Sequence, residues 1–256
     1  MTSPQKKHLF ESLHAGLNDD LMNAFNTIME SYTKQDGGLF FVYGSGGTGK
    51  TYLWNTLITK FHSERKIVIS VASSGIPALL LPGGKMAHSR FKISLNLDES
   101  SCCSTNLGTD LARLIQEASL IIWDEAPMVS RQAFEAVDRT FRDILKDFEC
   151  CSKDRVFGGK LFVLGGDFRQ ILPVVTKGGR EHIVQASLPS ASIWDHCQVL
   201  YLRRNMRVIG QNVSNESRSQ LCEFVDWILS VDEGKLSAIS FSEGYEPNWI
   251  IPADFS

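Results

Sequence analysis

The sequence predicts an α/β fold in which a parallel sheet is covered by helices on both faces. Between residues 36 and 202, short apolar runs alternate with amphipathic stretches, as in βαβ units. The runs are nearly continuous in β-branched and aromatic residues, which is typical of strands buried on both faces. A glycine-rich loop follows the first run and precedes a helical stretch. The 256 residues, 43% of them hydrophobic, suffice for one sizeable core.

Five of the apolar runs are expected to be strands. They are residues 39–43, 66–72, 119–124, 160–166 and 197–202. Helices are expected at 17–34, 51–61, 131–148 and 217–230. In the third of these helices, apolar side chains recur at helical spacing, which indicates a face packed on the core. The serine- and asparagine-rich stretch 93–109 has no such periodicity and predicts a loop.

The chain is expected to divide into three parts. Residues 1–16 are expected to form a flexible N-terminal segment, residues 17–210 the α/β domain, and residues 211–256 a C-terminal helix and connector. A net charge of −3 excludes a wholly basic protein, although a local basic groove stays possible. No apolar run approaches the roughly 20 residues that cross a bilayer, so no membrane partner is expected. The six cysteines lack CxxC spacing, which argues against zinc and favours reduced, intracellular thiols.

Residues 44–51, GSGGTGKT, match the pattern G-x-x-x-x-G-K-S/T in full. Glycines let successive backbone N–H groups turn toward a phosphate, and the following helix adds the positive end of its dipole. Lys50 is expected to reach the β- and γ-phosphates, and the Thr51 hydroxyl to bind Mg²⁺. The alternative, a Rossmann-type turn, has G-x-G-x-x-G and no lysine–threonine pair. The residues expected to bind nucleotide are Gly44, Ser45, Gly46, Gly47, Thr48, Gly49, Lys50, Thr51 and Tyr52.

Polar residues also follow two of the other predicted strands. Asp124 ends one strand and is expected to hold Mg²⁺, while Glu125 is expected to orient and deprotonate the attacking water. Elsewhere an Asp-Glu pair is usually a solvated turn, and the alternative here is nucleotide binding without turnover. Gln170 follows Gly165-Gly166-Asp167 at the end of the other strand, and its amide is expected to sense the γ-phosphate.

Taken in order, the motifs GSGGTGKT, VASSGIPALLLPGGKMAHSRFKI, DEAPM, GGDFRQILPV and LRRNMR resemble those of Pif-type, RecD-like 5′-to-3′ DNA helicases. The match is best with the eukaryotic branch that includes Helitron-transposon helicases, and it covers residues 17–207. It implies a RecA-like P-loop NTPase fold with ATP and Mg²⁺ as cofactors. It also implies catalytic roles for Lys50, Glu125, Gln170 and Arg207, the last as a γ-phosphate contact. The alternative for Arg207 is a solvated basic residue.

The resemblance also implies single-stranded DNA as a partner. Hydroxyl and amide groups suit contacts to phosphates, whereas aromatic and basic side chains combine base stacking with phosphate pairing. The residues expected to contact DNA are Ser73, Ser74, Gly75, His88, Arg90, Phe91, Lys92, Pro173 and Val174. Taken alone, His88 is more typical of an ordinary loop histidine.

The sequence departs from the family pattern at two places. Leu21 stands where a glutamine of the family reads the adenine, which leaves purine selectivity open. Nothing after residue 230 has the length of the family's second RecA-like domain, so we expect a first motor domain (1A), monomeric and unable to unwind DNA alone. The family suggests DNA repair, recombination or telomere maintenance in the nucleus or mitochondrion. Other readings are a nucleotide-regulated binding module without translocation and a transposon-derived helicase relic.

Overall fold

The computed structural model describes residues 3–146, residues 154–206, and residues 223, 224, 227, 228 and 230. The chain divides into two units, Met1–Arg204 and Asn205–Ser256, and the first holds the sheet. Arg207 lies outside the described residues. So does most of the expected helix 217–230, of which the described residues are helical.

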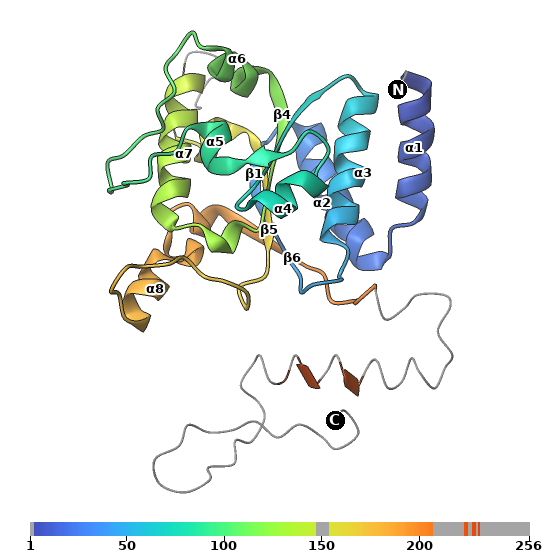
Figure 1. The fold of residues 1–256 in the computed structure, drawn as a ribbon. Helices are drawn as coiled ribbons and strands as arrows, with labels where there is room; N and C mark the ends of the chain where they lie inside the picture. Colours follow the sequence, from blue (N-terminus) through green and yellow to red (C-terminus); the bar gives the residue numbers. More distant parts are fainter. Residues whose placement is uncertain (1–2, 147–153, 207–222, 225–226, 229, 231–256) are drawn as a thin grey trace, which may run out of the picture. The chain divides into compact units, whose positions relative to one another are not determined.

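The centre of the first unit is a sheet of six strands (Figure 1). They are β1 (Gly38–Tyr43), β2 (Ile67–Ala72), β3 (Lys85–Met86), β4 (Ala118–Asp124), β5 (Leu161–Gly166) and β6 (Cys197–Tyr201). All pairings are parallel, and the strand order is β3-β2-β4-β5-β1-β6. The five expected strands are therefore confirmed. The two-residue β3 was not predicted, because Lys85 and Met86 are exposed and form no apolar run.

Helices cover both faces of this sheet, as predicted (Figure 1). The α-helices are α1 (Ser3–Ala15), α2 (Asp19–Lys34), α3 (Lys50–Ser63), α4 (Gly75–Leu80), α5 (Ala87–Phe91), α6 (Asp110–Glu117), α7 (Arg131–Leu145) and α8 (Arg180–Ala186). Short 3₁₀ helices lie at η1 (Ala126–Met128), η2 (Val156–Gly159), η3 (Leu188–Ser190) and η4 (Trp194–His196). Within the described residues, no helix combines the length and the apolar character that a membrane crossing requires.

The two halves of the core follow from the alternation of side chains along each strand. In β4, Leu120 and Ile122 point to the face covered by α2 and α3, while Ile121 and Trp123 point to the face covered by α5, α6 and α7. All four side chains are fully buried. Because both faces are covered, the strand reads as one continuous apolar run, and this is why it was predictable.

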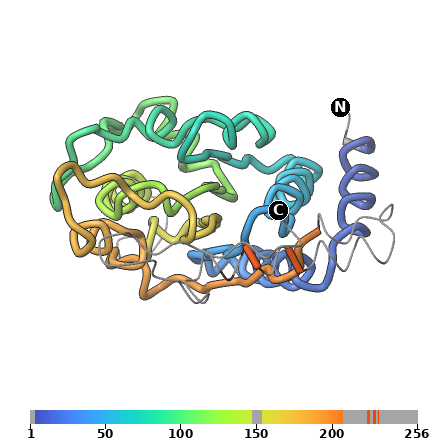
Figure 2. The backbone as a smooth tube through the Cα atoms, turned by 60° about the horizontal axis from the view of Figure 1, so that its bottom comes forward, coloured from blue at the N-terminus to red at the C-terminus, as the bar shows by residue number. Residues whose placement is uncertain are grey.

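Residues 1–16 were expected to be flexible, but residues 3–15 form helix α1 instead. The helix packs beside α3 (Figure 2). The Tyr52 hydroxyl of α3 donates a hydrogen bond to the Leu13 carbonyl at 2.8 Å, and a Cβ on Gly16 would lie only 2.2 Å from the same hydroxyl oxygen. The Phe10 ring packs against Phe25 of α2, with 5.9 Å between ring centroids. The sequence missed this helix because α1 has no strong apolar stripe.

Candidate functional site

Three loops that carry predicted site residues meet at one edge of the sheet. In a parallel sheet, the carboxyl ends of all strands lie at the same edge, and this is where α/β proteins bind ligands. The strand order places β4, β5 and β1 side by side. Tyr43, at the end of β1, pairs with Gly166, at the end of β5. The loops beginning at Gly44, Asp124 and Asp167 are therefore neighbours, as the sequence predicted.

The glycine-rich loop joins β1 to the first turn of α3 and needs its glycines. Gly47 and Gly49 have φ angles of 87° and 95°, in the left-handed region that favours glycine. A Cβ on Gly44 would lie 2.4 Å from the Thr48 hydroxyl oxygen. That hydroxyl donates to the Ser45 carbonyl at 2.8 Å and closes the loop. The loop is thus a compact backbone turn that ends at a helix N-terminus, as a phosphate cradle requires.

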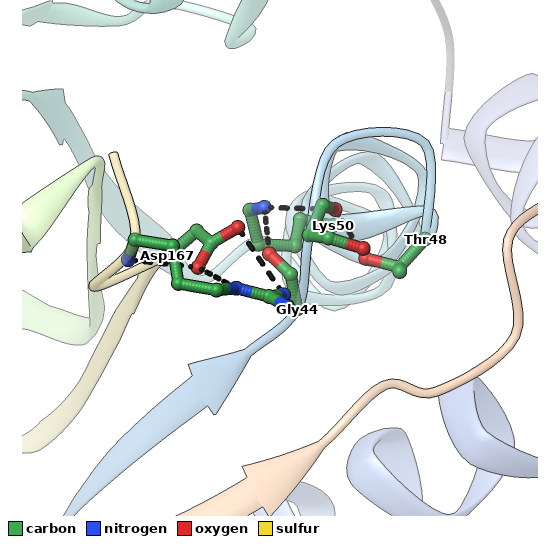
Figure 3. Close-up of polar contacts among 6 residues, drawn as sticks. Gly44, Thr48, Lys50 and Asp167 are labelled. Carbon is green, nitrogen blue, oxygen red and sulfur yellow. Dashed lines mark hydrogen bonds and ion pairs between the residues drawn. The ribbon is translucent and has the colours of Figure 1, made fainter. Parts of the chain in front are cut away.

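Lys50 lies at the centre of this loop. Its side chain is buried, and Nζ donates to the Gly44 carbonyl at 2.6 Å and lies 3.4 Å from the Ser45 carbonyl (Figure 3). These two carbonyl oxygens hold the ammonium group. A phosphate that enters the loop competes with them for the same protons. Thr51, the next residue, is half-buried in the first turn of α3. Tyr52 directs its hydroxyl to helix α1 and not to the loop.

Asp124 and Glu125 lie at the tip of β4. Asp124 is 5% exposed, and one of its carboxylate oxygens accepts the Glu125 backbone N–H at 3.1 Å. Burial raises the pKa of Asp124, and the neighbouring Trp54 indole and Lys50 ammonium oppose that increase. Glu125 has φ 52° and ψ 40°, a left-handed conformation that is uncommon for a residue with a side chain. This conformation turns the chain abruptly from β4 into η1. Uncommon backbone angles of this kind concentrate at functional sites.

The Glu125 carboxyl lies in a crowded negative environment. Burial raises its pKa first, Asp124 and Asp167 add to the increase, and Lys50 opposes it. Within the described part of the chain, Oε2 is buried and has no hydrogen-bond partner. A buried carboxylate oxygen without a partner is costly, which indicates a group that a ligand or water completes.

Two glycines let β5 come close to this pair of carboxylates. A Cβ on Gly165 would lie 2.3 Å from the Trp54 ring and 3.4 Å from a carboxylate oxygen of Asp124. A Cβ on Gly166 would lie 2.3 Å from the Pro127 ring. The glycine pair that the sequence showed at this strand end is therefore required by close packing.

These residues fit a magnesium ion and a nucleoside triphosphate. The donors are the Thr51 hydroxyl and the Asp124 carboxylate, hard oxygen ligands of the kind that Mg²⁺ takes beside phosphates. The loop supplies backbone N–H groups and Lys50. Glu125 Oε2 is the buried oxygen that lacks a partner.

Gln170 follows β5 at the same edge. Its backbone N–H donates to the Asp167 carbonyl at 3.1 Å, and its side chain is exposed. Two neighbours that the sequence analysis did not select, Asp167 and Arg169, lie deeper than Gln170 and pair with each other. The signal was available as an acidic and a basic residue two apart at a predicted strand end.

Some of the expected DNA contacts are exposed, and others are engaged inside the fold. Ser73 is used inside the fold: its backbone N–H donates to the Asp124 carbonyl at 3.1 Å, and its hydroxyl accepts the Trp123 indole N–H at 3.0 Å. Ser74 and Gly75 begin α4, where Gly75 is exposed. Val174 is 89% exposed.

Phe91 and Pro173 do not support the expected contact. Phe91 is 2% exposed, and its ring packs against Trp123 and Phe141, with centroids 5.8 Å and 5.7 Å away. A side chain in the core cannot stack on a base, so the prediction for Phe91 is wrong. Pro173 is also buried.

The basic residues around Phe91 remain available. A recess of about 270 Å³ is lined by Lys85, Arg90 and Lys92 together with residues of α6. Within the described residues, Arg90 Nε is buried and has no hydrogen-bond partner. His88 is half-buried, and burial lowers its pKa, so the imidazole is neutral near pH 7.

The segment after β6 carries two further arginines. The backbone N–H groups of Arg203 and Arg204 donate to the Asp20 carboxylate at 2.9 Å and 3.2 Å. The Arg204 guanidinium pairs with Asp19 at 2.9 Å. Both arginines therefore attach this segment to the N-terminus of α2.

A model of the PIF1-like helicase family matches residues 16–241. The chain belongs to this family. The chain is 30% identical over 214 residues to the ATP-dependent DNA helicase Pif1 of Campylobacter jejuni, a match that covers 79% of the chain and 43% of the relative. It is 29% identical over 161 residues to the ATP-dependent DNA helicase RRM3 of Saccharomyces cerevisiae, covering 61% of the chain and 21% of the relative. The chain thus spans less than half the length of these PIF1-like relatives.

Solved structures of PIF1-like helicases share the fold. Bacteroides Pif1 bound to single-stranded DNA matches with a TM-score of 0.65 and 22% identity, over 86% of this chain and 47% of that one. The complex of Bacteroides Pif1 with ADP-AlF4 matches with a TM-score of 0.63, also at 22% identity and over the same shares of the two chains. These likenesses confirm the predicted RecA-like P-loop NTPase fold.

Proposed function

We propose that this chain is the ATP-binding and ATP-hydrolysing motor domain of a 5′-to-3′ DNA helicase. One observation carries the proposal: Lys50, Asp124 and Glu125 lie on neighbouring loops at one sheet edge. They are close enough there for Asp124 to raise the pKa of the Glu125 carboxyl and for Lys50 to lower it. Membership of the PIF1-like family supports it, as does the ADP-AlF4 complex of Bacteroides Pif1.

In the proposed reaction, Lys50 exchanges the loop carbonyls for the β- and γ-phosphates. Thr51 and Asp124 hold Mg²⁺, which neutralises charge on the phosphates when it is bound. Glu125 orients the attacking water and accepts its proton; the raised pKa of its carboxyl makes it a better base than an exposed glutamate. Gln170 and Arg207 contact the γ-phosphate.

Single-stranded DNA is the proposed track. The recess lined by Lys85, Arg90 and Lys92 supports it, because lysine and arginine bind phosphates without regard to sequence. His88 then contributes as a neutral hydrogen-bonding ring. No base-specific readout is proposed. The DNA-bound structure of Bacteroides Pif1 supports this choice of partner.

Translocation needs two lobes that open and close around the nucleotide. Because the chain spans 43% or less of the relatives described above, we infer that it contributes the first lobe. Alone, it is then a monomer that hydrolyses ATP slowly and does not unwind a duplex. We also propose that the chain belongs to the eukaryotic, Helitron-like branch, which its motifs taken together resemble best. With it we propose a role in DNA repair, recombination or telomere maintenance in the nucleus or mitochondrion.

The test is ATP hydrolysis with and without a single-stranded oligonucleotide. Glu125→Gln should keep nucleotide binding and lose about 100-fold or more of the turnover, since a general base contributes on this scale. The matched control is Glu117→Gln, an exposed glutamate just before β4, which should hydrolyse as the wild type does. Wild-type turnover by Glu125→Gln would contradict the role of this residue. Nucleotide binding with neither turnover nor DNA binding would instead indicate a nucleotide-regulated binding module.

A further inference from the structure

The turn after β5 contains a buried ion pair between Asp167 and Arg169. The Asp167 side chain is 6% exposed and that of Arg169 is 20% exposed. One carboxylate oxygen of Asp167 accepts both the backbone N–H of Arg169 at 3.1 Å and its Nε–H at 3.0 Å (Figure 3). The second oxygen lies 3.5 Å from a terminal guanidinium nitrogen. The pair therefore fixes both the backbone of the turn and the direction of the arginine.

Arg169 also reaches the strand that leads into the glycine-rich loop. Its guanidinium carbon lies 5.7 Å from the centre of the Tyr43 ring, a distance at which a cation and an aromatic face attract each other. Tyr43 directly precedes Gly44, whose carbonyl accepts the Lys50 ammonium. The ring of Phe168, between the paired residues, stacks on Phe41 of β1 at 4.8 Å. The turn thus packs against β1 at two residues, through Phe168 on Phe41 and through Arg169 on Tyr43.

The charge of Asp167 matters to the site beside it. Asp167 is buried and contributes, with Asp124, to the negative field at Glu125. Arg169 offsets that charge through the ion pair. A buried ion pair is weak grounds for stability, because desolvation of both charges offsets most of their attraction. The pair instead fixes the backbone of the turn that lies beside the proposed catalytic residues.

We propose that Arg169 is a positioning residue for nucleotide turnover. Through Asp167 and Tyr43 it holds the turn 167–170 against the glycine-rich loop, and so places Gln170 where the γ-phosphate arrives. The inference rests on the proposed function, because it assumes a triphosphate in this loop. Arg169 acts through Gln170 and need not touch the nucleotide.

The experiment compares the affinity for ADP with that for a non-hydrolysable ATP analogue, together with kcat, KM and the melting temperature. Arg169→Met should lower kcat about 10- to 100-fold, because small misplacements of a positioned group cost this much. The same change should weaken binding of the analogue more than binding of ADP, since only the analogue has a γ-phosphate. Arg169→Lys should recover part of the loss, because it keeps the charge.

Two double variants sharpen the test. Arg169→Met combined with Gln170→Ala should have the same kcat as Gln170→Ala alone, since both changes remove the same contact of Gln170 with the γ-phosphate. Arg169→Met combined with Asp167→Asn should be less impaired than Arg169→Met alone, because no unpaired charge is left buried. The matched control is Arg142→Met, which breaks an ion pair of similar burial with Asp138 on α7 and should alter only stability.

Several results would overturn the inference. The inference is refuted if Arg169→Met behaves like Arg142→Met, with a lower melting temperature and an unchanged kcat. Equal losses for ADP and the analogue would indicate a purely structural role and refute it as well. A wild-type chain that binds nucleotide without turnover refutes the hydrolysis proposed above, while the ratio of the two affinities still decides the role of Arg169.

Discussion

Replacement of Phe91 by alanine distinguishes the predicted DNA contact from the observed core position. Phe91 is 2% exposed and contacts the rings of Trp123 and Phe141. Removal of a buried phenylalanine ring costs about 3–5 kcal/mol, from lost burial and from the cavity left behind. For a chain of this size, each kcal/mol lowers the melting temperature by about 2–4 °C, so a decrease of about 6–20 °C is expected.

The assay is thermal unfolding followed by circular dichroism, with oligonucleotide binding measured well below the transition. Phe91→Ala should bind DNA as the wild type does wherever it is folded. Phe91→Leu is the control, because it keeps most of the volume and should cost less than about 1.5 kcal/mol. An unchanged melting temperature together with weakened DNA binding would refute the reasoning and return Phe91 to the DNA surface.

Three further predictions concern the two ligand sites. Arg90→Ala and Lys92→Ala should each weaken single-stranded DNA binding and reduce its salt slope by about 1, whereas Lys66→Ala, an exposed lysine at the opposite end of β2, should not. Because burial lowers the pKa of His88, the ring should gain less charge than an exposed histidine as the pH falls from about 8 to 6.5, so DNA affinity at constant salt should change little. Gly165→Ala places a Cβ 2.3 Å from a buried indole, so calorimetry should show about 1–3 kcal/mol of destabilisation together with reduced ATP turnover.

The strands and the nucleotide loop were predictable from the sequence because their causes are local. A strand covered on both faces must be apolar throughout, as 119–124 is. The loop at 44–51 needs glycines wherever it occurs. That Lys50 and Asp124 meet required only one more step, since parallel strands end at the same edge.

The predictions that failed depend on how side chains and helices are oriented, which the sequence alone does not show. In MAHSRFKI, basic and aromatic residues alternate, and only the orientation of the short helix α5 decides that Phe91 enters the core while Arg90 lines the recess. Asp167 and Arg169 can be read from the sequence as two opposite charges, but the burial of their ion pair depends on how β5 packs beside β1. Helix α1 is held by contacts with α3, which no local pattern reveals.

The hydrogen bond from the Ser73 backbone to the Asp124 carbonyl has a mechanical consequence. Asp124 begins one of the loops at the candidate nucleotide site, and Ser73 begins the stretch that leads through α4 toward the basic recess. If the β4 tip moves during the proposed ATP cycle, this 3.1 Å bond and the parallel pairing of β2 with β4 carry the movement to the neighbouring strand. In the proposed function, the nucleotide site and the DNA-binding stretch are therefore joined directly at Ser73.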